Sequence, residues 1–334
     1  MDTSAPITVG VIGVGHLGSL HAKMYAEISD AAFAGVFDVD AERRDNIAGM
    51  FSVRAFDSLD GLLGEVNAVS IATVTSSHFE VAKRALDAGV HVLIEKPITQ
   101  TLAEADELIK LARARGCLIQ VGHIERFNPA ILALEAYNLK PMFIESHRLA
   151  QFNPRGTDVA VVLDLMIHDI DIILSLVHSP VASIDANGVA VVSDSADIAN
   201  ARLKFQNGCV ANVTASRISQ NKMRKMRMFQ HNAYISIDFS QGMAEVFRLV
   251  ENGGPASQST MMLGRIGEGK KKRTIVYEQP EVKEVNALKY ELESFVRSIR
   301  TGEPPVVSGA DGRSALEVAQ EILKKIEVQK FSGA

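Results

Sequence analysis

Polar side chains recur at regular intervals within a very apolar stretch of the chain, residues 159–177. They are Asp164, His168, Asp171 and Ser175, at successive spacings of four, three and four. At about 100° per helical residue, these positions fall within roughly 60° of one another. A buried unpaired acid costs several kcal/mol, so the stripe must face polar partners or a cleft. His168 could abstract a hydroxyl proton, with Asp164 orienting it or holding substrate, although for the helix alone a satisfied His–Asp core network is the slightly better interpretation.

A second candidate for chemistry is Lys96, which follows the apolar run HVLI and Glu95. Ligands of open α/β sheets bind outside the carboxyl ends of strands, which directs Lys96 toward such a crevice. An ammonium there can bind the oxygen of a reacting hydroxyl or take part in proton transfer. Its position alone supports this role and that of an ordinary solvated lysine about equally.

The segment ITVGVIGVGHLG, residues 7–18, combines a buried strand with the pattern G-x-G-x-x-G and a following helix. The first glycine allows a tight turn, the second lets a pyrophosphate approach the backbone, and the third allows close helix packing. The N–H groups at the helix N-terminus then hold the phosphates. The predicted cofactor-binding residues here are Gly13, Gly15, His16, Leu17 and Gly18.

Asp38 ends the second expected strand, twenty positions after Gly18. A carboxylate there accepts hydrogen bonds from the adenosine ribose hydroxyls, although it could also simply cap a helix. NAD is expected in preference to NADP, because Asp38 would repel a 2′-phosphate and no basic residue follows it directly. Arg43 and Arg44 are expected on the solvated face of the next helix.

Several hydroxyl residues and a histidine follow the fourth strand. Thr73 is predicted to contact the cofactor at the strand end, and Ser76 or Ser77 to cap a helix that begins near His78. His78 and Glu95 are also candidates for cofactor binding, although a histidine at a helix start more often packs or caps than reacts.

Further candidates follow the sixth strand and precede the striped helix. His123 and Arg126 lie where the chain leaves the cofactor domain, and Arg155 lies just before the helix. Arginine pairs with phosphate oxygens in a bidentate way, so these cations could bind a diphosphate. Arg217 is another cation near a strand end, for which an ordinary surface ion pair is the better interpretation.

Alternating strands and helices occupy the first 121 residues and predict a doubly wound parallel sheet. The expected strands are 7–12, 32–37, 53–56, 68–72, 91–94 and 117–121, and the expected helices are 17–28, 41–50, 58–63, 78–88 and 102–115. A helix over 159–177 then precedes several alternating segments joined by turns such as Asn207-Gly208, which predicts a largely antiparallel sheet. Helices over 287–300 and 310–329 close the chain. The expected domains are 1–122 and 123–334.

The composition excludes several classes of protein. With 334 residues, 47% apolar residues and a net charge of −5, the chain resembles a globular protein without a nucleic-acid surface. Two distant cysteines, Cys117 and Cys209, argue against a zinc site and a disulfide framework. No signal peptide and no uninterrupted apolar run of membrane length is found, so we expect a cytoplasmic protein. GxSxG and P-loop patterns are absent.

The motifs together resemble the Gfo/Idh/MocA family of NAD(P)-dependent oxidoreductases. The residues that carry the resemblance are GVIGVGHLGSLHA, the segment 71–97 ending in HVLIEKP, VGHIERFNPA, and DLMIHDID. It implies an N-terminal Rossmann domain and a C-terminal α/β domain with a large open, mainly antiparallel sheet. It also implies that Lys96 lies beside the nicotinamide with a cis peptide bond to Pro97, that His168 is the catalytic base, and that Asp164 binds substrate. Val74 departs from the family, in which proline is common at this position.

The resemblance is strongest to members that act on UDP-sugars, because of the segment GHIERFNPA. We therefore expect an NAD-dependent dehydrogenase, with UDP-N-acetylglucosamine oxidised at C3 as the first choice. The alternatives are a dehydrogenase for inositol or free sugars, a non-catalytic NAD-binding regulator, and an enzyme that recycles its NAD. We also expect a homodimer or homotetramer formed through the C-terminal sheet, since strands such as VANVTASRI and MRKMRMF carry apolar residues on both alternating sets.

Overall fold

The computed structural model describes residues 5–153, 159–251, 260–267, 273–282, 284–326 and 328–330. The chain forms two compact units, the first from residues 1–127 and 285–317 and the second from 128–284 and 318–334. The linear division expected at residue 122 omits this return of the chain to the first unit. The return occurs because α8 (Ala287–Thr301) supplies Leu292, Phe295 and Val296 to the core of the first unit.

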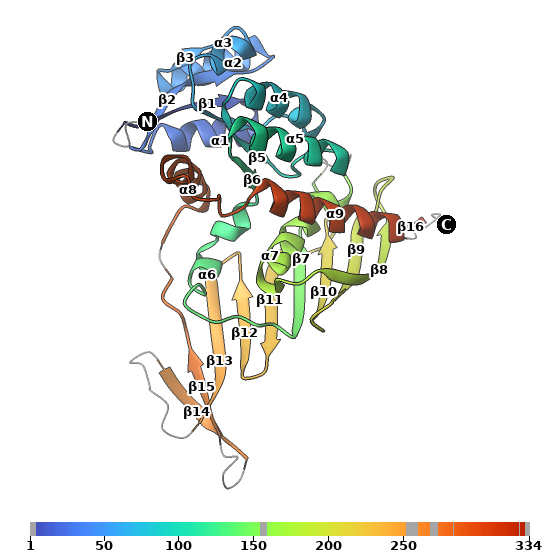
Figure 1. The fold of residues 1–334 in the computed structure, drawn as a ribbon. Helices are drawn as coiled ribbons and strands as arrows, with labels where there is room; N and C mark the ends of the chain where they lie inside the picture. Colours follow the sequence, from blue (N-terminus) through green and yellow to red (C-terminus); the bar gives the residue numbers. More distant parts are fainter. Residues whose placement is uncertain are drawn as a thin grey trace. The chain divides into compact units, whose positions relative to one another are not determined.

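The first unit contains a six-stranded parallel sheet with the strand order of a doubly wound fold (Figure 1). Across the sheet the strands are β3 (Arg54–Ala55), β2 (Ala31–Phe37), β1 (Ile7–Ile12), β4 (Ala68–Ile71), β5 (His91–Glu95) and β6 (Ile119–Gly122). The predicted Rossmann sheet is therefore confirmed. The helices that alternate with the strands are α1 (His16–Tyr25), α2 (Ala41–Phe51), α3 (Leu59–Leu63), α4 (Thr75–Asp87) and α5 (Leu102–Arg115).

Helix boundaries differ from the sequence prediction at two places. Helix α4 begins at Thr75, and its N-cap is Val74 without a side-chain hydrogen bond, so Ser76 and Ser77 lie inside the first turn and do not cap it. Helix α9 (Gly309–Lys325) ends four residues before the expected Gln329. Gln329 instead lies in β16 (Val328–Lys330), which pairs in parallel with β8 (Val181–Ala190). Helical periodicity alone did not reveal this edge strand.

The second unit contains a ten-stranded sheet in the order β14-β15-β13-β12-β11-β7-β10-β9-β8-β16. Its other strands are β7 (Phe143–Leu149), β9 (Ile198–Phe205), β10 (Val210–Ser216), β11 (Met223–Gln230), β12 (Ala233–Asp238), β13 (Met243–Glu251), β14 (Thr260–Ile266) and β15 (Arg273–Glu278). Two neighbouring pairs, β7 with β10 and β8 with β16, are parallel, and the rest are antiparallel. The predicted large, mainly antiparallel sheet is confirmed, and β7 and β14 are strands that the sequence analysis did not identify.

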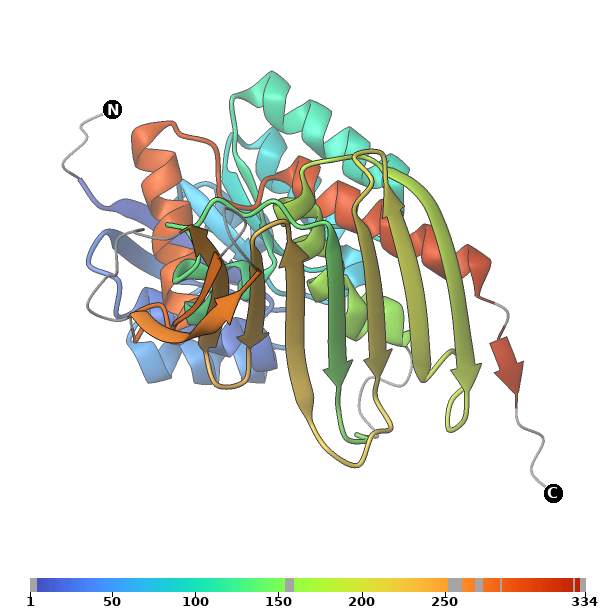
Figure 2. The same ribbon diagram turned by 90° about the horizontal axis from the view of Figure 1, so that it is seen from below.

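One face of this large sheet is packed and the other is open within the described residues. The alternate residues Ala199, Ala201, Leu203 and Phe205 of β9 are buried, whereas their neighbours are exposed. Helix α7 (Ile167–Val177) lies on the packed face, and Figure 2 shows the open face toward the viewer with no helix across it. A hydrophobic face on one side and solvent on the other is the usual arrangement of an antiparallel sheet.

An aromatic row crosses the open face, strand by strand. Its members are direct cross-strand neighbours, with consecutive ring centroids 5.0–6.0 Å apart: Phe143, Phe229, Tyr234, Phe247 and Tyr277. Elsewhere the open face carries polar groups, such as Asn212 and Thr214 of β10 and the ion pair between Arg227 and Glu145, and β14 adds the exposed Met261 beside Tyr277. The expectation of apolar residues on both faces of these strands is therefore wrong for β10, whose outward set is mainly polar.

Candidate active site

The glycine-rich loop has the geometry that a dinucleotide needs. Gly13 has φ +79°, and a Cβ on Gly18 would lie 1.8 Å from the Gly13 carbonyl oxygen, so neither position accepts a side chain. A Cβ on Gly15 would meet nothing within 4 Å, which leaves open space beside the backbone. Gly15 is also the N-cap of α1, and because it has no side chain it leaves the first N–H groups of the helix uncapped. The first N–H groups of α1 therefore face a space that suits a pyrophosphate.

Asp38 lies directly after β2 and is bound to this loop. Its Oδ2 accepts the Val14 N–H at 2.7 Å, and its Oδ1 accepts the Asp40 N–H at 2.9 Å. The carboxylate retains lone pairs for ribose hydroxyls, because each oxygen can accept more than one hydrogen bond. Arg43 is exposed, as expected, and its Nη1 lies 3.5 Å from Asp38 Oδ2. Arg44, which was also expected on the solvated face, is mostly buried because it pairs with Asp45 and Asp57.

His78 connects the two strand ends on which the nicotinamide end of a dinucleotide would lie. Its ring nitrogens lie 2.9 Å from the Pro97 carbonyl oxygen and 3.1 Å from that of Thr73. The side chain is 1% exposed, and burial lowers the pKa of His78 despite these two acceptors. His78 thus fixes the segment of Thr73 to that of Lys96–Pro97, and its ring does not face solvent. The Lys96–Pro97 peptide bond is cis, as expected.

Two exposed valines at the same edge were not among the predicted cofactor-binding residues. Val39 follows Asp38 and is 93% exposed, and Val74 follows Thr73 and is 70% exposed. Leu17, which was predicted, is also an exposed apolar side chain. Apolar side chains in these positions suit the flat faces of an adenine ring or the carbons of a ribose. The sequence feature that could have identified them is an apolar residue directly after the polar residue that follows each strand, Val39 after Asp38 and Val74 after Thr73.

The first unit therefore brings together the glycine loop, Asp38, Thr73, Glu95 and Lys96 at the carboxyl edge of the parallel sheet. These residues fit NAD, because they combine an uncapped helix N-terminus, a ribose acceptor and exposed apolar surface. The same unit holds His123 and Arg126 after β6: His123 is 1% exposed, whereas Arg126 is partly exposed. A direct contact with a diphosphate thus suits Arg126 better than His123. Arg155 lies outside the described residues.

In the second unit, Asp164 and His168 lie on a helix that changes its winding between them. The predicted continuous α-helix begins as a π-helix, η2 (Val162–Met166), and becomes α7 at Ile167. Backbone bonds in a π-helix span five residues, so the assumed 100° per residue does not hold between Asp164 and His168. Single π-turns within helices are frequent at functional sites. Both side chains are partly exposed, which permits contact with a ligand.

The other two members of the polar stripe, Asp171 and Ser175, do not present polar groups to a ligand as Asp164 and His168 can: one is buried and the other bonds to its own helix. Ser175 donates to the Ile172 carbonyl oxygen at 2.7 Å, and Asp171 is 1% exposed. Asp169, which lies off the stripe, forms a bidentate ion pair with Arg148 of β7, with Nε–Oδ2 at 2.7 Å and Nη2–Oδ1 at 3.2 Å. This buried pair fixes α7 to the sheet beside His168. Only the first half of the stripe therefore remains a candidate site.

Arg217 is a structural residue in this structure. Its Nε lies 2.9 Å from Asp197 Oδ1, and its Nη1 donates to the Val159 carbonyl oxygen at 2.6 Å. Burial alone would raise the pKa of Asp197, but the N–H groups of Val191, Val192 and Ser193 lower it to about 2. The pair joins the β8–β9 loop to the residue that leads into η2. The interpretation of Arg217 as an ion-paired residue is confirmed, but the expected surface location is wrong, because the pair with Asp197 is buried.

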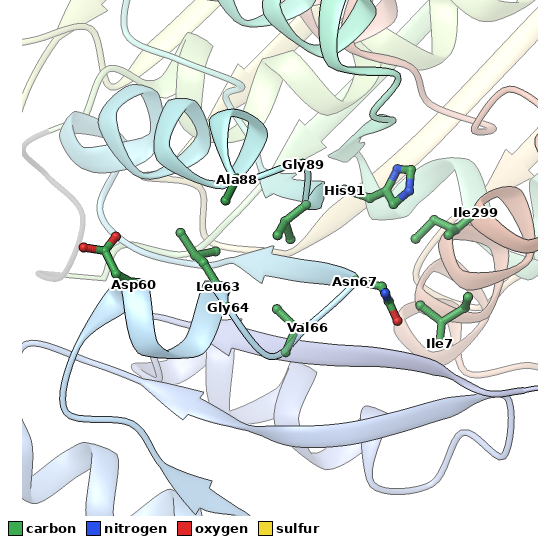
Figure 3. Close-up of a pocket in the computed structure, with 11 residues that line it drawn as sticks. Ile7, Asp60, Leu63, Gly64, Val66, Asn67, Ala88, Gly89, His91 and Ile299 are labelled. Atoms are coloured by element: carbon green, nitrogen blue, oxygen red, sulfur yellow. The ribbon is translucent and has the colours of Figure 1, made fainter. Parts of the chain in front are cut away.

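A pocket of about 460 Å³ lies at the opposite, amino edge of the parallel sheet (Figure 3). Residues before or at the starts of β1, β4 and β5 line it, among them Ile7, Asn67 and His91. Asn67 Oδ1 accepts the Thr8 N–H at 3.1 Å, and His91 Nδ1 accepts the Leu118 N–H at 2.9 Å. These polar groups are engaged in hydrogen bonds within the first unit, so this pocket is not the cofactor site.

No helix in the described part of the chain is long and apolar enough to cross a membrane.

Two family profiles match the chain. One is described as an oxidoreductase family with an NAD-binding Rossmann fold and matches residues 7–123, and the other is the GFO/IDH/MocA C-terminal domain, which matches residues 136–245. Together they cover the strands of the parallel sheet and most of those of the large sheet.

Several characterised proteins are similar over nearly the whole chain. A UDP-N-acetylglucosamine 3-dehydrogenase of Acidithiobacillus ferrooxidans is 41% identical over 95% of this chain and 96% of its own length. Its solved structure superposes with a TM-score of 0.86 over 96% of this chain and 98% of that one. A myo-inositol 2-dehydrogenase of Thermotoga maritima is 24% identical over 96% of this chain and 97% of its own length.

Proposed function

Since this chain belongs to the Gfo/Idh/MocA oxidoreductase family, whose N-terminal domain is an NAD-binding Rossmann fold, we propose that it oxidises a ring hydroxyl of a UDP-linked N-acetylhexosamine. UDP-N-acetylglucosamine, oxidised at C3, is the first choice. The observation that carries this choice is the 41% identity to a UDP-N-acetylglucosamine 3-dehydrogenase, against 24% to a myo-inositol 2-dehydrogenase that is matched over a similar share of the chain.

The residues of this chain divide the work of the oxidation. His168 accepts the proton of the reacting hydroxyl as its oxygen becomes a carbonyl oxygen, with Asp164 binding the substrate beside it. The Lys96 ammonium hydrogen-bonds the same oxygen and stabilises its negative charge during the reaction. NAD, when bound, supplies the acceptor for the hydride that leaves the ring carbon.

The cofactor is held by the residues at the carboxyl edge of the parallel sheet. The N–H groups that follow Gly15 hold the pyrophosphate, and Asp38 accepts from the adenosine ribose. Val39 and Val74 provide the apolar faces for the adenine. Thr73 and Lys96 contact the nicotinamide end, and His78 fixes their segments to each other.

A nucleotide-linked substrate requires cations beyond the catalytic lysine. Arg126, partly exposed after β6, is the described residue best suited to a diphosphate, and Arg155 is proposed as a second. A free sugar or cyclitol has no diphosphate and needs neither arginine. Arg126→Ala should therefore raise KM for the nucleotide sugar while changing kcat little.

The proposal is tested with a panel of hydride donors. UDP-N-acetylglucosamine, free N-acetylglucosamine, glucose and myo-inositol are compared by kcat/KM with NAD. The highest value is expected for the nucleotide sugar. A higher value for a free sugar or inositol would rule out the substrate assignment, and the absence of any NAD reduction with the whole panel would favour a regulatory protein.

We further propose that the protein is a cytoplasmic homodimer or homotetramer. The aromatic row on the open face of the large sheet supports assembly, since five partly exposed rings would gain from a second copy. Cys117 and Cys209 are both reduced and buried, which agrees with a reducing compartment.

A further inference from the structure

Arg43 lies in the first turn of α2, shortly after the residue that is proposed to bind the adenosine ribose. Its Nη1 is 3.5 Å from Oδ2 of Asp38, and its Nη2 is 3.1 Å from Oδ2 of Asp40. The two arms of one guanidinium therefore meet two different carboxylates. Arg44, the next residue, is engaged elsewhere, because it pairs with two other acids. Arg43 is thus the cation of this turn that lies beside Asp38.

Asp40 holds Arg43 through both its backbone and its side chain. Asp40 is the N-cap of α2, and its Oδ1 accepts the Arg43 N–H at 3.0 Å. The N–H of Asp40 in turn donates to Oδ1 of Asp38 at 2.9 Å. The three residues therefore form a closed set of contacts, in which each one touches the other two.

The stability of α2 does not account for a cation at this place. The N-terminus of a helix carries partial positive charge, so a cation in the first turn is unfavourable. The two ion pairs offset this only weakly, because the Arg43 side chain is 49% exposed and exposed ion pairs contribute little to stability. The position of Arg43 therefore points to an interaction with a ligand.

The ligand group that this position concerns is the 2′-phosphate of NADP. This phosphate replaces a ribose hydroxyl of the kind from which Asp38 is proposed to accept. Two carboxylates and one guanidinium leave the set with a net negative charge, which repels a phosphate. Arginine alone would attract it, since its planar fork pairs with two phosphate oxygens. In this structure both arms of the fork are turned to carboxylates.

We propose that Arg43 is a latent binding residue for a 2′-phosphate, and that Asp40 determines cofactor specificity by keeping it neutralised together with Asp38. Asp40 thus acts against NADP through Arg43, whereas Asp38 acts directly. This inference rests on the proposed function only for the position of the adenosine ribose at Asp38.

The test measures dinucleotide binding to the full chain and requires no sugar substrate. Dissociation constants of NAD and NADP are determined by calorimetry at low ionic strength, where exposed charges are least screened. The variants are Asp40→Asn, Asp40→Asn with Arg43→Ala, and Asp40→Asn with Asp38→Asn. Asparagine caps a helix as well as aspartate does, so Asp40→Asn should retain α2. Circular dichroism checks the fold of each variant.

The matched control is Asp45→Asn, which makes the same change of charge on the same helix. Asp45 is 59% exposed and pairs with Nε of Arg44 at 2.8 Å, so it does not contact Arg43 in this structure. The control should change the dissociation constant of NADP by less than about twofold, because exposed charges act weakly over longer distances.

Asp40→Asn should bind NADP about tenfold more tightly than wild type while its affinity for NAD changes by about twofold or less. One charge removed beside a doubly charged phosphate is worth about that factor in a solvated site. Adding Arg43→Ala should cancel the gain, since the phosphate then loses its charge-assisted hydrogen bonds. In Asp38→Asn with Asp40→Asn, NADP should bind at least as tightly as NAD. If this double variant does not fold, the comparison of Asp40→Asn with and without Arg43→Ala decides alone.

Equal NADP affinities in Asp40→Asn and Asp45→Asn would overturn the proposal, and so would a gain that survives Arg43→Ala. These outcomes are distinguishable from failure of the proposed function. A gain that depends on Arg43, in a protein that oxidises no sugar nucleotide, contradicts the function and supports the role of Asp40. Turnover of the sugar nucleotide without any gain in Asp40→Asn contradicts the role of Asp40 alone.

Discussion

Replacing Asp197 with asparagine should destabilise the second unit by about 2 to 3 kcal/mol at neutral pH. The side chain of Asp197 is 0% exposed, and its Oδ2 accepts three backbone N–H groups, from Val191 and Val192 at 2.7 Å and from Ser193 at 3.1 Å. These bonds lower the pKa from 3.8 to about 2. At about 1.4 kcal/mol per pKa unit, this lowering corresponds to a stabilisation on the order of 2 kcal/mol.

The pH dependence of this contribution has a definite sign. Because the pKa of Asp197 is lower in the folded state, the stabilisation is complete above the unfolded value of 3.8 and is lost as the pH falls toward about 2. Urea unfolding followed by circular dichroism should show the difference between wild type and Asp197→Asn at pH 7 and its decline in acid.

The control for this experiment is Asp185→Asn in the same unit. Asp185 is 71% exposed and lies 3.8 Å from Lys204, so the change should cost at most a few tenths of a kcal/mol. A loss in Asp197→Asn no larger than in this control would refute the reasoning. Asp197→Asn should also raise KM for the sugar nucleotide. Arg217 links Asp197 to the Val159 carbonyl oxygen just before η2, and η2 carries the proposed substrate-binding residue Asp164.

Other predictions concern the site and the assembly. Lys96→Ala and His168→Ala should each lower kcat by about 10²-fold or more while NAD binding measured by calorimetry is retained; near-normal turnover in His168→Ala would make it a structural residue. Calorimetry should also show tighter binding of NAD than of NADP, because Asp38 repels a 2′-phosphate even though Arg43 lies nearby. Equal affinities for the two cofactors would contradict this prediction. Phe229→Asp in the aromatic row should lower the mass measured by light scattering at micromolar concentration, and Thr214→Asp, away from the row, should not; a monomeric wild type would contradict the assembly.

The cofactor half of the site could be predicted from the sequence because its determinants are local. Strand, glycine turn and helix are contiguous in residues 7–25, and Asp38 and Lys96 each directly follow a strand of the same sheet. In a parallel sheet all carboxyl ends lie at one edge, so the residues converge without knowledge of side-chain packing. Alternation of strands and helices was sufficient to predict a doubly wound parallel sheet in this unit, and the structure supplied its strand order.

The rest depended on contacts between distant segments. The π-turn at Val162–Met166 has the composition of an ordinary helix, so periodicity predicted a single α-helix. The ion pair of Arg148 with Asp169 joins residues 21 positions apart, and the contact of His21 with Glu95 joins residues 74 apart. Neither pairing can be predicted from local sequence, because several acids in the chain could have paired with each of these two side chains.

The central claim is best tested with UDP-N-acetylglucosamine that carries deuterium at C3. After incubation with the wild-type enzyme and NAD, the recovered cofactor is analysed by mass spectrometry. The account predicts reduced cofactor that carries the deuterium, together with a 3-keto sugar nucleotide. Reduced cofactor without deuterium, or no transfer from this substrate while another donor reacts, would contradict it.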